Sequence, residues 1–258
     1  MDVILTSISS GLPPAAVLGA LAVALVAGLI KGVVGFAMPM VMVSGLSLML
    51  PPDIALAALI LPVLVSNLMQ TLRGGAEGLW PLIVRFRFYL ATLVVVLLAA
   101  TQLVTVISDR AFFLVIGLPV TLFSLVQLAG WQLRLQRQSR WTDFGVGAIS
   151  GFFGGLSGVW GPPTVAYLTA LDLAKAQHVR VQGIIYFSGS VMLMVGHLRS
   201  GIVNAQTFPL SVALLIPAVI GMLAGGKFQD RIDQKTFRRA TLIVLLVAGV
   251  NLLRRAVF

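Results

Sequence analysis

The chain has 258 residues, of which 59% are hydrophobic and only 10% are charged, and its mean hydropathy is +1.03. These values exclude a water-soluble domain, which does not need so much apolar sequence, and indicate a chain that lies in lipid. The net charge of +10 comes from Lys and Arg residues spread between apolar stretches, which fits the loops of a membrane protein and not a nucleic-acid-binding face.

Apolar stretches follow one another along the chain, separated by short polar interruptions. They cover residues 13–30, 36–50, 54–72, 79–104, 112–130, 144–159, 162–171, 179–198, 208–226 and 237–253. The first follows Asp2 without a preceding Lys or Arg, so we expect mature protein there and not a secretory signal peptide. Two pieces, 39–50 and 162–171, are only about 18 and 15 Å long as helices, roughly half of a ~30 Å hydrocarbon core. We expect these two to be half-helices.

Both short pieces follow a glycine-rich break, and the chain repeats itself when the breaks are aligned. At a constant offset of 123 residues, the matching positions are Gly28, Gly32, Gly35 and Pro39 in the first half and Gly151, Gly155, Gly158 and Pro162 in the second. Glycines spaced by four lie on one helix face, where they permit close helix packing. Packing does not explain the prolines, because a proline inside a span removes a backbone donor. The pattern therefore predicts unwound backbone that lines a cavity at both breaks.

The basic residues favour one of two arrangements of the repeats. If each broken segment is re-entrant, the halves are inverted, and 13 Lys and Arg residues are cytoplasmic against four outside, namely Arg110, Arg199, Arg254 and Arg255. If each broken segment crosses the membrane, the halves are parallel, and the count is nine against eight. The positive-inside rule favours the inverted arrangement, with both termini outside, and the crossing alternative stays open at this point.

We therefore predict an all-α, polytopic integral membrane protein of two inverted repeats, each a broken or re-entrant helical hairpin followed by three transmembrane helices. The first repeat covers residues 1–130, a basic cytoplasmic linker covers 131–143, and the second repeat covers 144–258. Inverted repeats with broken helices are typical of secondary transporters, whose binding site lies near the midplane where the repeats meet.

The ionisable residues indicate an anionic substrate. All eight acidic residues lie at segment ends or in loops, and a span without a carboxylate has nothing to compensate a buried cation. Lys31 is the one basic residue inside a predicted break, where it either supplies a counter-charge in the cavity or extends to the interface. Half-helices that begin near Pro39 and Pro162 would add free amide groups that favour anions. Without cysteine, no thiolate metal site can form, and we expect neither a metal nor a cofactor.

The expected substrate-binding residues come from both breaks and from the helices that follow them. They are Lys31, Gly32, Gly35, Asn67, Gln70, Gly155, Ser157, Gly158, Trp160, Gln182 and Tyr186. For the polar members, hydrogen bonding between helices is the alternative role. Trp160 either stacks on a substrate or anchors the break by packing. His197 is a candidate coupling group for protons or an ordinary histidine at the interface.

The glycine-proline breaks at 28–39 and 151–163, set in duplicated halves, resemble those of the TauE/SafE family of sulfite and organosulfonate exporters over nearly the whole chain. The resemblance implies export of a small anion, such as sulfite, sulfoacetate or a related sulfonate, from the bacterial cytoplasm. It also implies that the two breaks are the functional region. The role of Lys31 rests on the physical argument alone.

Two other transport functions stay open, because the same donors would serve an anion channel or a transporter of small carboxylates. An enzyme is not expected, since the spans contain no metalloprotease-like histidine cluster, no Asp pair and no Ser beside a base. We expect a multi-pass protein of the bacterial inner (plasma) membrane. Its expected partners are a small anionic substrate and membrane lipid, with no nucleic acid, and the sequence allows a homodimer.

Overall fold

The structure is a computed structural model that describes residues 13–73, 75–131, 135, 137–171, 173, 175–228 and 234–257. Over these residues it contains helices and no strand, which confirms the all-helical class. The helices are α2 (Pro14–Val34), α3 (Met38–Leu46), α4 (Pro52–Leu72), α5 (Leu79–Arg85), α6 (Arg87–Thr101), α7 (Asp109–Leu128), α8 (Arg140–Ser157), α9 (Gly161–Ala170), α10 (Lys175–Arg199), α11 (Phe208–Phe228) and α12 (Gln234–Val257). The predicted linker 131–143 falls partly outside the described residues, at 132–134 and 136.

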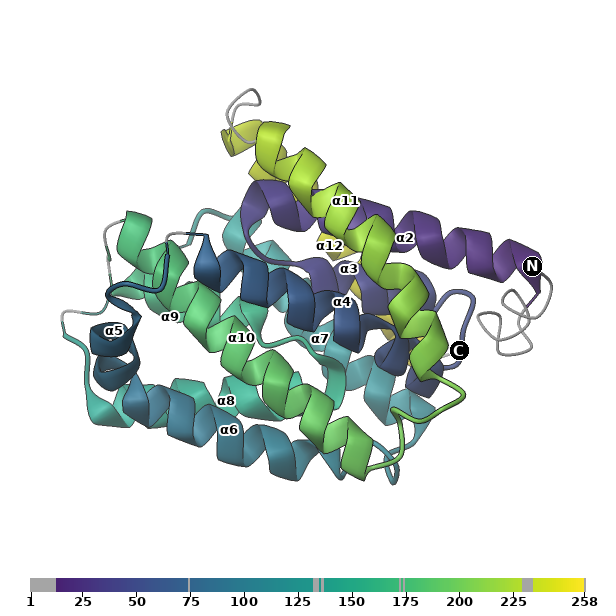
Figure 1. Cartoon of the computed structure of the whole chain (residues 1–258), viewed down its shortest axis with the longest axis horizontal. Coiled ribbons are helices and arrows are strands. Elements are labelled where there is room, and N and C mark those ends of the chain that lie inside the picture. Colours follow the sequence, from purple (N-terminus) through teal and green to yellow (C-terminus); the bar gives the residue numbers. More distant parts are fainter. Residues whose placement is uncertain are drawn as a thin grey trace.

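Several described helices are long and apolar enough to cross a membrane. They are α2, α4, α7, α10 and α11, and the pair α5 and α6 qualifies if it counts as one span. That pair is bent by 73° at Phe86, where the sequence predicts one continuous segment. Arg85 and Arg87 flank the bend and stay exposed, because moving two guanidinium groups into hydrocarbon is costly. The chain is a multi-pass membrane protein, and the axes of its long helices are roughly aligned, with some helices pointing one way and others the opposite way (Figure 1).

Two short helices, α3 and α9, follow the breaks at the expected places. α2 ends at Gly35, whose φ of 82° is left-handed and whose backbone N–H donates to the carbonyl oxygen of Lys31. Ala37 also has a left-handed φ of 78°, and Pro39 lies in the first turn of α3. α8 ends in the same way at Gly158, with a φ of 72°, before α9. Lys31 is therefore in the last turn of α2, and the expectation that it lies inside the break is wrong.

The glycines of α2 pack against a helix of the other half of the chain, α11. A side chain at Gly28 would collide with the backbone oxygen of Ala218, and one at Gly32 would collide with that of Met222. Because the two sets of residue numbers rise together, α2 and α11 are parallel.

The glycines of α8 take the corresponding role against α6. Gly151 lies against the backbone oxygen of Leu93, and Gly155 lies against that of Leu97, so these two helices are also parallel. The close approach leaves no room for a Cβ atom at either glycine. A packing role for the glycines spaced by four is thus confirmed, and each half contributes one helix to each pair.

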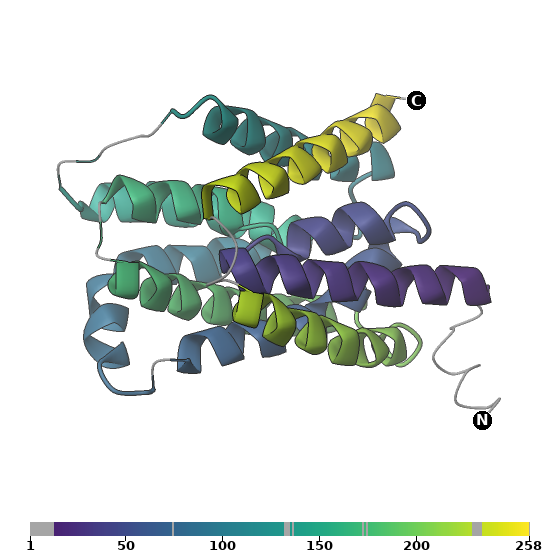
Figure 2. The same cartoon turned by 90° about the horizontal axis from the view of Figure 1, so that it is seen from above.

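Helices at corresponding positions of the two halves pack in opposite directions. Along α4 and α10, Asn67 lies beside Tyr186 and Thr71 lies beside Gly183, so one residue number falls as the other rises. α7 and α12 show the same antiparallel pattern around Gly117. The first turn of α2 and the last turn of α12 lie at the same end of the molecule (Figure 2).

Candidate functional site

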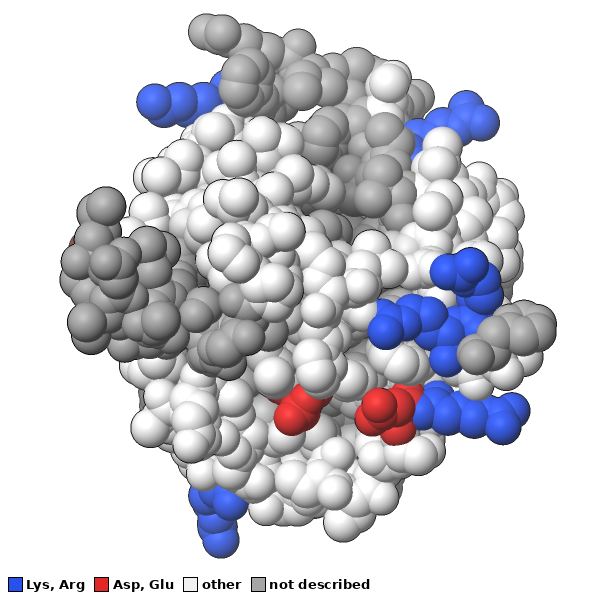
Figure 3. All heavy atoms as spheres, turned by 90° about the vertical axis from the view of Figure 1, so that its right-hand side faces the viewer, with Lys and Arg blue, Asp and Glu red and all other residues white. Residues whose placement is uncertain are grey.

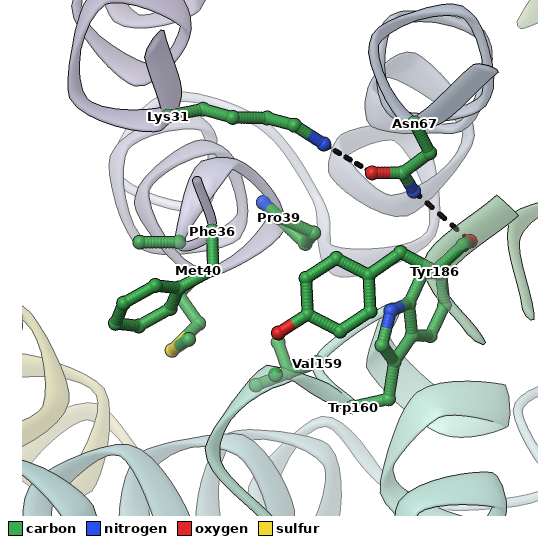
Figure 4. Close-up of a pocket in the computed structure, with 10 residues that line it drawn as sticks. Lys31, Phe36, Pro39, Met40, Asn67, Val159, Trp160 and Tyr186 are labelled. Atoms are coloured by element: carbon green, nitrogen blue, oxygen red, sulfur yellow. Dashed lines mark hydrogen bonds between the residues drawn. The ribbon is translucent and has the colours of Figure 1, made fainter. Parts of the chain in front are cut away.

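In the structure the two breaks are residues 35–37, between α2 and α3, and residues 158–160, between α8 and α9. They lie against each other and enclose a small pocket, which we call the central pocket (Figure 4). A side chain at Gly158 would touch Pro39, and one at Gly161 would touch Met40, so each break supplies a wall for the other. The lining consists of Lys31, Phe36, Ala37, Pro39, Met40, Asn67, Val159, Trp160, Gly161 and Tyr186. The free space is about 10 Å³, roughly the room that one water molecule needs.

Lys31 reaches the central pocket from the last turn of α2 and is only 2% exposed (Figure 4). Its ammonium donates to Oδ1 of Asn67, while Nδ2 of Asn67 donates to the backbone oxygen of Tyr186 at 3.1 Å. Within the described residues, Asn67 is the only hydrogen-bond partner of this ammonium, so no carboxylate balances its charge. A buried cation without a counter-charge is costly, and a bound anion would supply the missing charge.

A larger cavity of about 380 Å³, the basic vestibule, opens beside the central pocket and shares Lys31 with it. It is lined by Lys31, Gly32, Val34, Gly35, Met69, Gln70, Arg73, Gln182, Met222, Leu223, Gly226 and Lys227. Arg73 directly follows α4, and Lys227 lies in the last turn of α11. These two residues bring two further cationic side chains to the cavity. Gln70 is 7% exposed, and neither polar atom of its carboxamide has a hydrogen-bond partner in the described structure. The basic vestibule therefore combines positive charge with an unused amide donor.

Apolar side chains close the opposite side of the central pocket. Trp160 is 1% exposed, and its ring packs where Gly154 and Gly189 have no side chains. Leu59 and Leu193 pack over the neighbouring Gly158. Lys31 thus joins the central pocket to the cavity that Arg73 and Lys227 line, while buried apolar side chains pack around Trp160 and Gly158.

The chain was compared with the sequence models of known protein families, and one of them matches. The model of the sulfite exporter TauE/SafE family matches residues 20–252 of the chain. The chain belongs to the TauE/SafE family. This membership confirms the resemblance seen in the sequence and assigns the chain to a family of membrane transporters of sulfite- and sulfonate-type anions. No curated protein and no solved structure matches it significantly.

In this TauE/SafE protein, most of the residues expected at the site line one of the two cavities. Asn67, Trp160 and Tyr186 line the central pocket, Gly32, Gly35, Gln70 and Gln182 line the basic vestibule, and Lys31 lines both. Gln182 is held in place because its Nε2 donates to the Tyr186 hydroxyl at 3.0 Å. These residues come from α2, the first break, α4, the second break and α10, so the fold brings both halves to one site.

The remaining expected residues line neither cavity. Gly155 packs on α6, and the Ser157 hydroxyl donates to the backbone oxygen of Phe153 at 2.7 Å within α8. His197 lies in the last turn of α10, where its Nδ1 is 3.3 Å from the Ser200 hydroxyl. None of these three residues, and not Gly158 either, lines the central pocket or the basic vestibule.

Sequence reasoning missed Arg73 and Lys227 as site residues and treated them only as charges that set the topology. The two side chains line the same cavity because α4 packs on α11, and no local sequence pattern shows that these two helices are neighbours. One signal for Lys227 was present, however. It follows Gly225 and Gly226, and Gly225 packs closely on α2 next to Gly32, so this glycine pair places the following lysine near the end of α2.

Proposed function

We propose that this TauE/SafE protein exports small anions, sulfite or an organosulfonate, across the bacterial inner membrane by alternating access to the central pocket. The observation that carries the proposal is the Lys31 ammonium, which is buried where the two breaks meet and which, in the part of the chain that the structure describes, has only the neutral Asn67 as a partner. A sulfonate offers three acceptor oxygens, and hydrogen bonds to an ionised acceptor are roughly twice as strong as neutral ones.

The basic vestibule gives the anion a route to Lys31. Arg73 and Lys227 would attract it at the mouth, and the Gln70 carboxamide would donate to it as it moves inward. Asn67 would hold the ammonium in position, since its own amide is fixed by the Tyr186 backbone. We assign anion binding to these side chains and to the backbone at Gly35.

Alternating access in this proposal rests on two inverted repeats. By their order in the two halves, α2 corresponds to α8 and α6 corresponds to α11, so the packed pair α2–α11 has its counterpart in the pair α8–α6. The corresponding helices α4 and α10 pack against each other and are antiparallel. A two-fold axis that lies in the membrane plane reverses the direction of corresponding helices, whereas an axis along the membrane normal keeps it. The antiparallel packing therefore supports inversion, and it agrees with the distribution of Lys and Arg.

The direction of opening fits loading from the cytoplasm. Arg73 and Lys227 belong to the end of the molecule that the positive-inside rule assigns to the cytoplasm, so the basic vestibule faces inward and Trp160 closes the outward side. In the outward-open state Trp160 would leave its place between Gly154 and Gly189. An inside-negative potential would favour export of an anion by about 2.3 kcal/mol per charge per 100 mV.

Flux into and out of liposomes tests the proposal. We expect saturable transport of sulfite and of a small sulfonate, accelerated by the same anion on the far side, with a dependence on membrane potential. Lys31→Met should remove this flux, whereas Arg110→Gln should retain it because Arg110 is exposed and lines neither cavity. Flux that neither saturates nor shows counterflow would identify a channel, and transport of carboxylates alone would reject the substrate class.

A further inference from the structure

A third cavity lies at the other end of α4, far from the basic vestibule. Its volume is about 350 Å³, and it is lined by Ser47, Leu48, Met49, Leu50, Pro51, Pro52, Asp109, Phe113 and Arg255. α4 runs for 21 residues from Pro52 at this cavity to Leu72, next to Arg73 in the basic vestibule, which separates the two by about 30 Å. Figure 3 views the end of the molecule at which α12 finishes, where basic side chains lie around the rim and acidic side chains lie in the lower middle of the view.

Two polar groups of this cavity have no partner in the described structure. Ser47 is fully buried, and its hydroxyl makes no hydrogen bond. Nη1 of Arg255 is also buried without a partner, while the guanidinium lies 4.6 Å from the centre of the Phe113 ring. The aromatic contact holds the guanidinium at this cavity and leaves Nη1 available to an acceptor.

We propose that this cavity is a second oxyanion site, which binds a tetrahedral phosphate or sulfonate group through Arg255 and Ser47. A guanidinium binds such a group through two parallel hydrogen bonds, and a buried hydroxyl can donate to a third oxygen. The ligand is the phosphate of an anionic lipid headgroup or a free oxyanion. Leu48 and Met49 line the same cavity and are 60% and 37% exposed, which gives a lipid ligand an apolar surface next to its phosphate.

Asp109 is the one acidic group among the described residues of this lining, and it works against the binding of an anion. It lies in the first turn of α7, where its charge stabilises the helix terminus, and its side chain is exposed to solvent. Solvent screens its repulsion of the ligand, whereas the buried face of Arg255 is screened much less. Removal of the Asp109 charge should therefore strengthen binding at this site.

The second site accounts for a feature that the topology leaves unexplained. Arg255 is one of only four basic residues on the side that the positive-inside rule assigns to the exterior. A bound oxyanion neutralises the guanidinium there. This inference does not depend on the function of the central pocket, because the site shares no residue with it or with the basic vestibule.

The test compares Arg255→Gln with Arg254→Gln in the purified full-length chain. Arg254 is the matched control, because it is adjacent and exposed and donates to Asn251 at 3.2 Å outside the cavity. Native mass spectrometry with added phosphatidylglycerol, and calorimetry with inorganic phosphate and methanesulfonate, measure the two ligand sources separately. We expect Arg255→Gln to weaken at least one of them by about tenfold or more, and Arg254→Gln to weaken none by more than about twofold.

The ligand that responds identifies the source. Loss of phosphatidylglycerol alone assigns a lipid site, and loss of phosphate or methanesulfonate alone assigns a site for free anions. Equal binding by the two arginine variants overturns the proposal. If Arg255→Gln does not fold, Ser47→Ala and Asp109→Asn provide the answer, since the first should weaken and the second should tighten binding. No change in either of these variants rejects the site.

Discussion

Replacement of Lys31 by methionine should change anion affinity and protein stability in different directions. The change keeps an unbranched side chain, one atom shorter, and removes the charge of a residue that is 2% exposed. Truncation of one partner of a buried, hydrogen-bonded charge pair typically costs about 2–5 kcal/mol of binding free energy. At about 1.4 kcal/mol per factor of ten, the dissociation constant for a sulfonate should rise at least roughly 30-fold.

The stability of the empty protein depends on two opposing effects of the same change. Loss of the ammonium removes a desolvation cost of several kcal/mol, on the order of that found for single buried ions. Loss of the donor leaves Oδ1 of Asn67 unpaired, at a cost of about 1–3 kcal/mol. The melting temperature of Lys31→Met should therefore equal or exceed that of the parent.

Calorimetry with a sulfonate and thermal unfolding followed by tryptophan fluorescence, both in detergent, measure the two quantities. Arg110→Met provides a control for the loss of one positive charge and should leave the affinity unchanged. A variant at Lys31 that binds as tightly as the parent refutes the counter-charge argument. A variant that loses affinity and stability together would show that Lys31 is a structural residue.

Three further changes test the packing, the sealed side and the orientation. Gly28→Ala should destabilise the protein by about 1–3 kcal/mol, since its Cβ would overlap the Ala218 backbone, whereas Gly145→Ala, with open space around it, should not lower the melting temperature. Trp160→Ala should open the central pocket to the outside, which would be measured as an uncoupled anion leak from liposomes. Liposomes with this variant that leak no more than those with the parent protein would show that Trp160 does not close the outward side. A single cysteine at Arg137, in a chain that has none, should react only with a cytoplasmic thiol reagent, and exclusive labelling from outside would reverse the orientation.

The local features of the fold could be predicted from the sequence, and the long-range ones could not. Hydropathy and the glycine-proline spacing predict the short helices α3 and α9, because proline and left-handed glycine act on the backbone next to them. The bend at Phe86 was missed, since the two arginines beside it sit within an otherwise apolar stretch. Lys31 was found because a lysine in apolar sequence is conspicuous, although its place in the last turn of α2 depends on where Gly35 ends that helix.

The parts of the site that sequence reasoning missed depend on contacts between the halves. Arg73 and Lys227 are more than 150 residues apart in sequence and meet only because α4 packs on α11. Trp160 could be recognised as unusual, but the place where its ring packs is formed by glycines in two different helices, α8 and α10. Periodicity reports which face of a helix is small or apolar, and it does not report which helix covers that face.

The exchange of helix partners between the halves has a consequence for assembly. α2 finds its glycine-mediated neighbour in α11, and α8 finds its own in α6, so neither half can complete its interior from its own helices. A fragment that ends before α8 would leave the bare backbone faces of α2 and α6 in contact with lipid. The first helices therefore reach their final packing only after the last helices have inserted. We expect the two halves, produced as separate chains, to fold only when they are present together in one membrane.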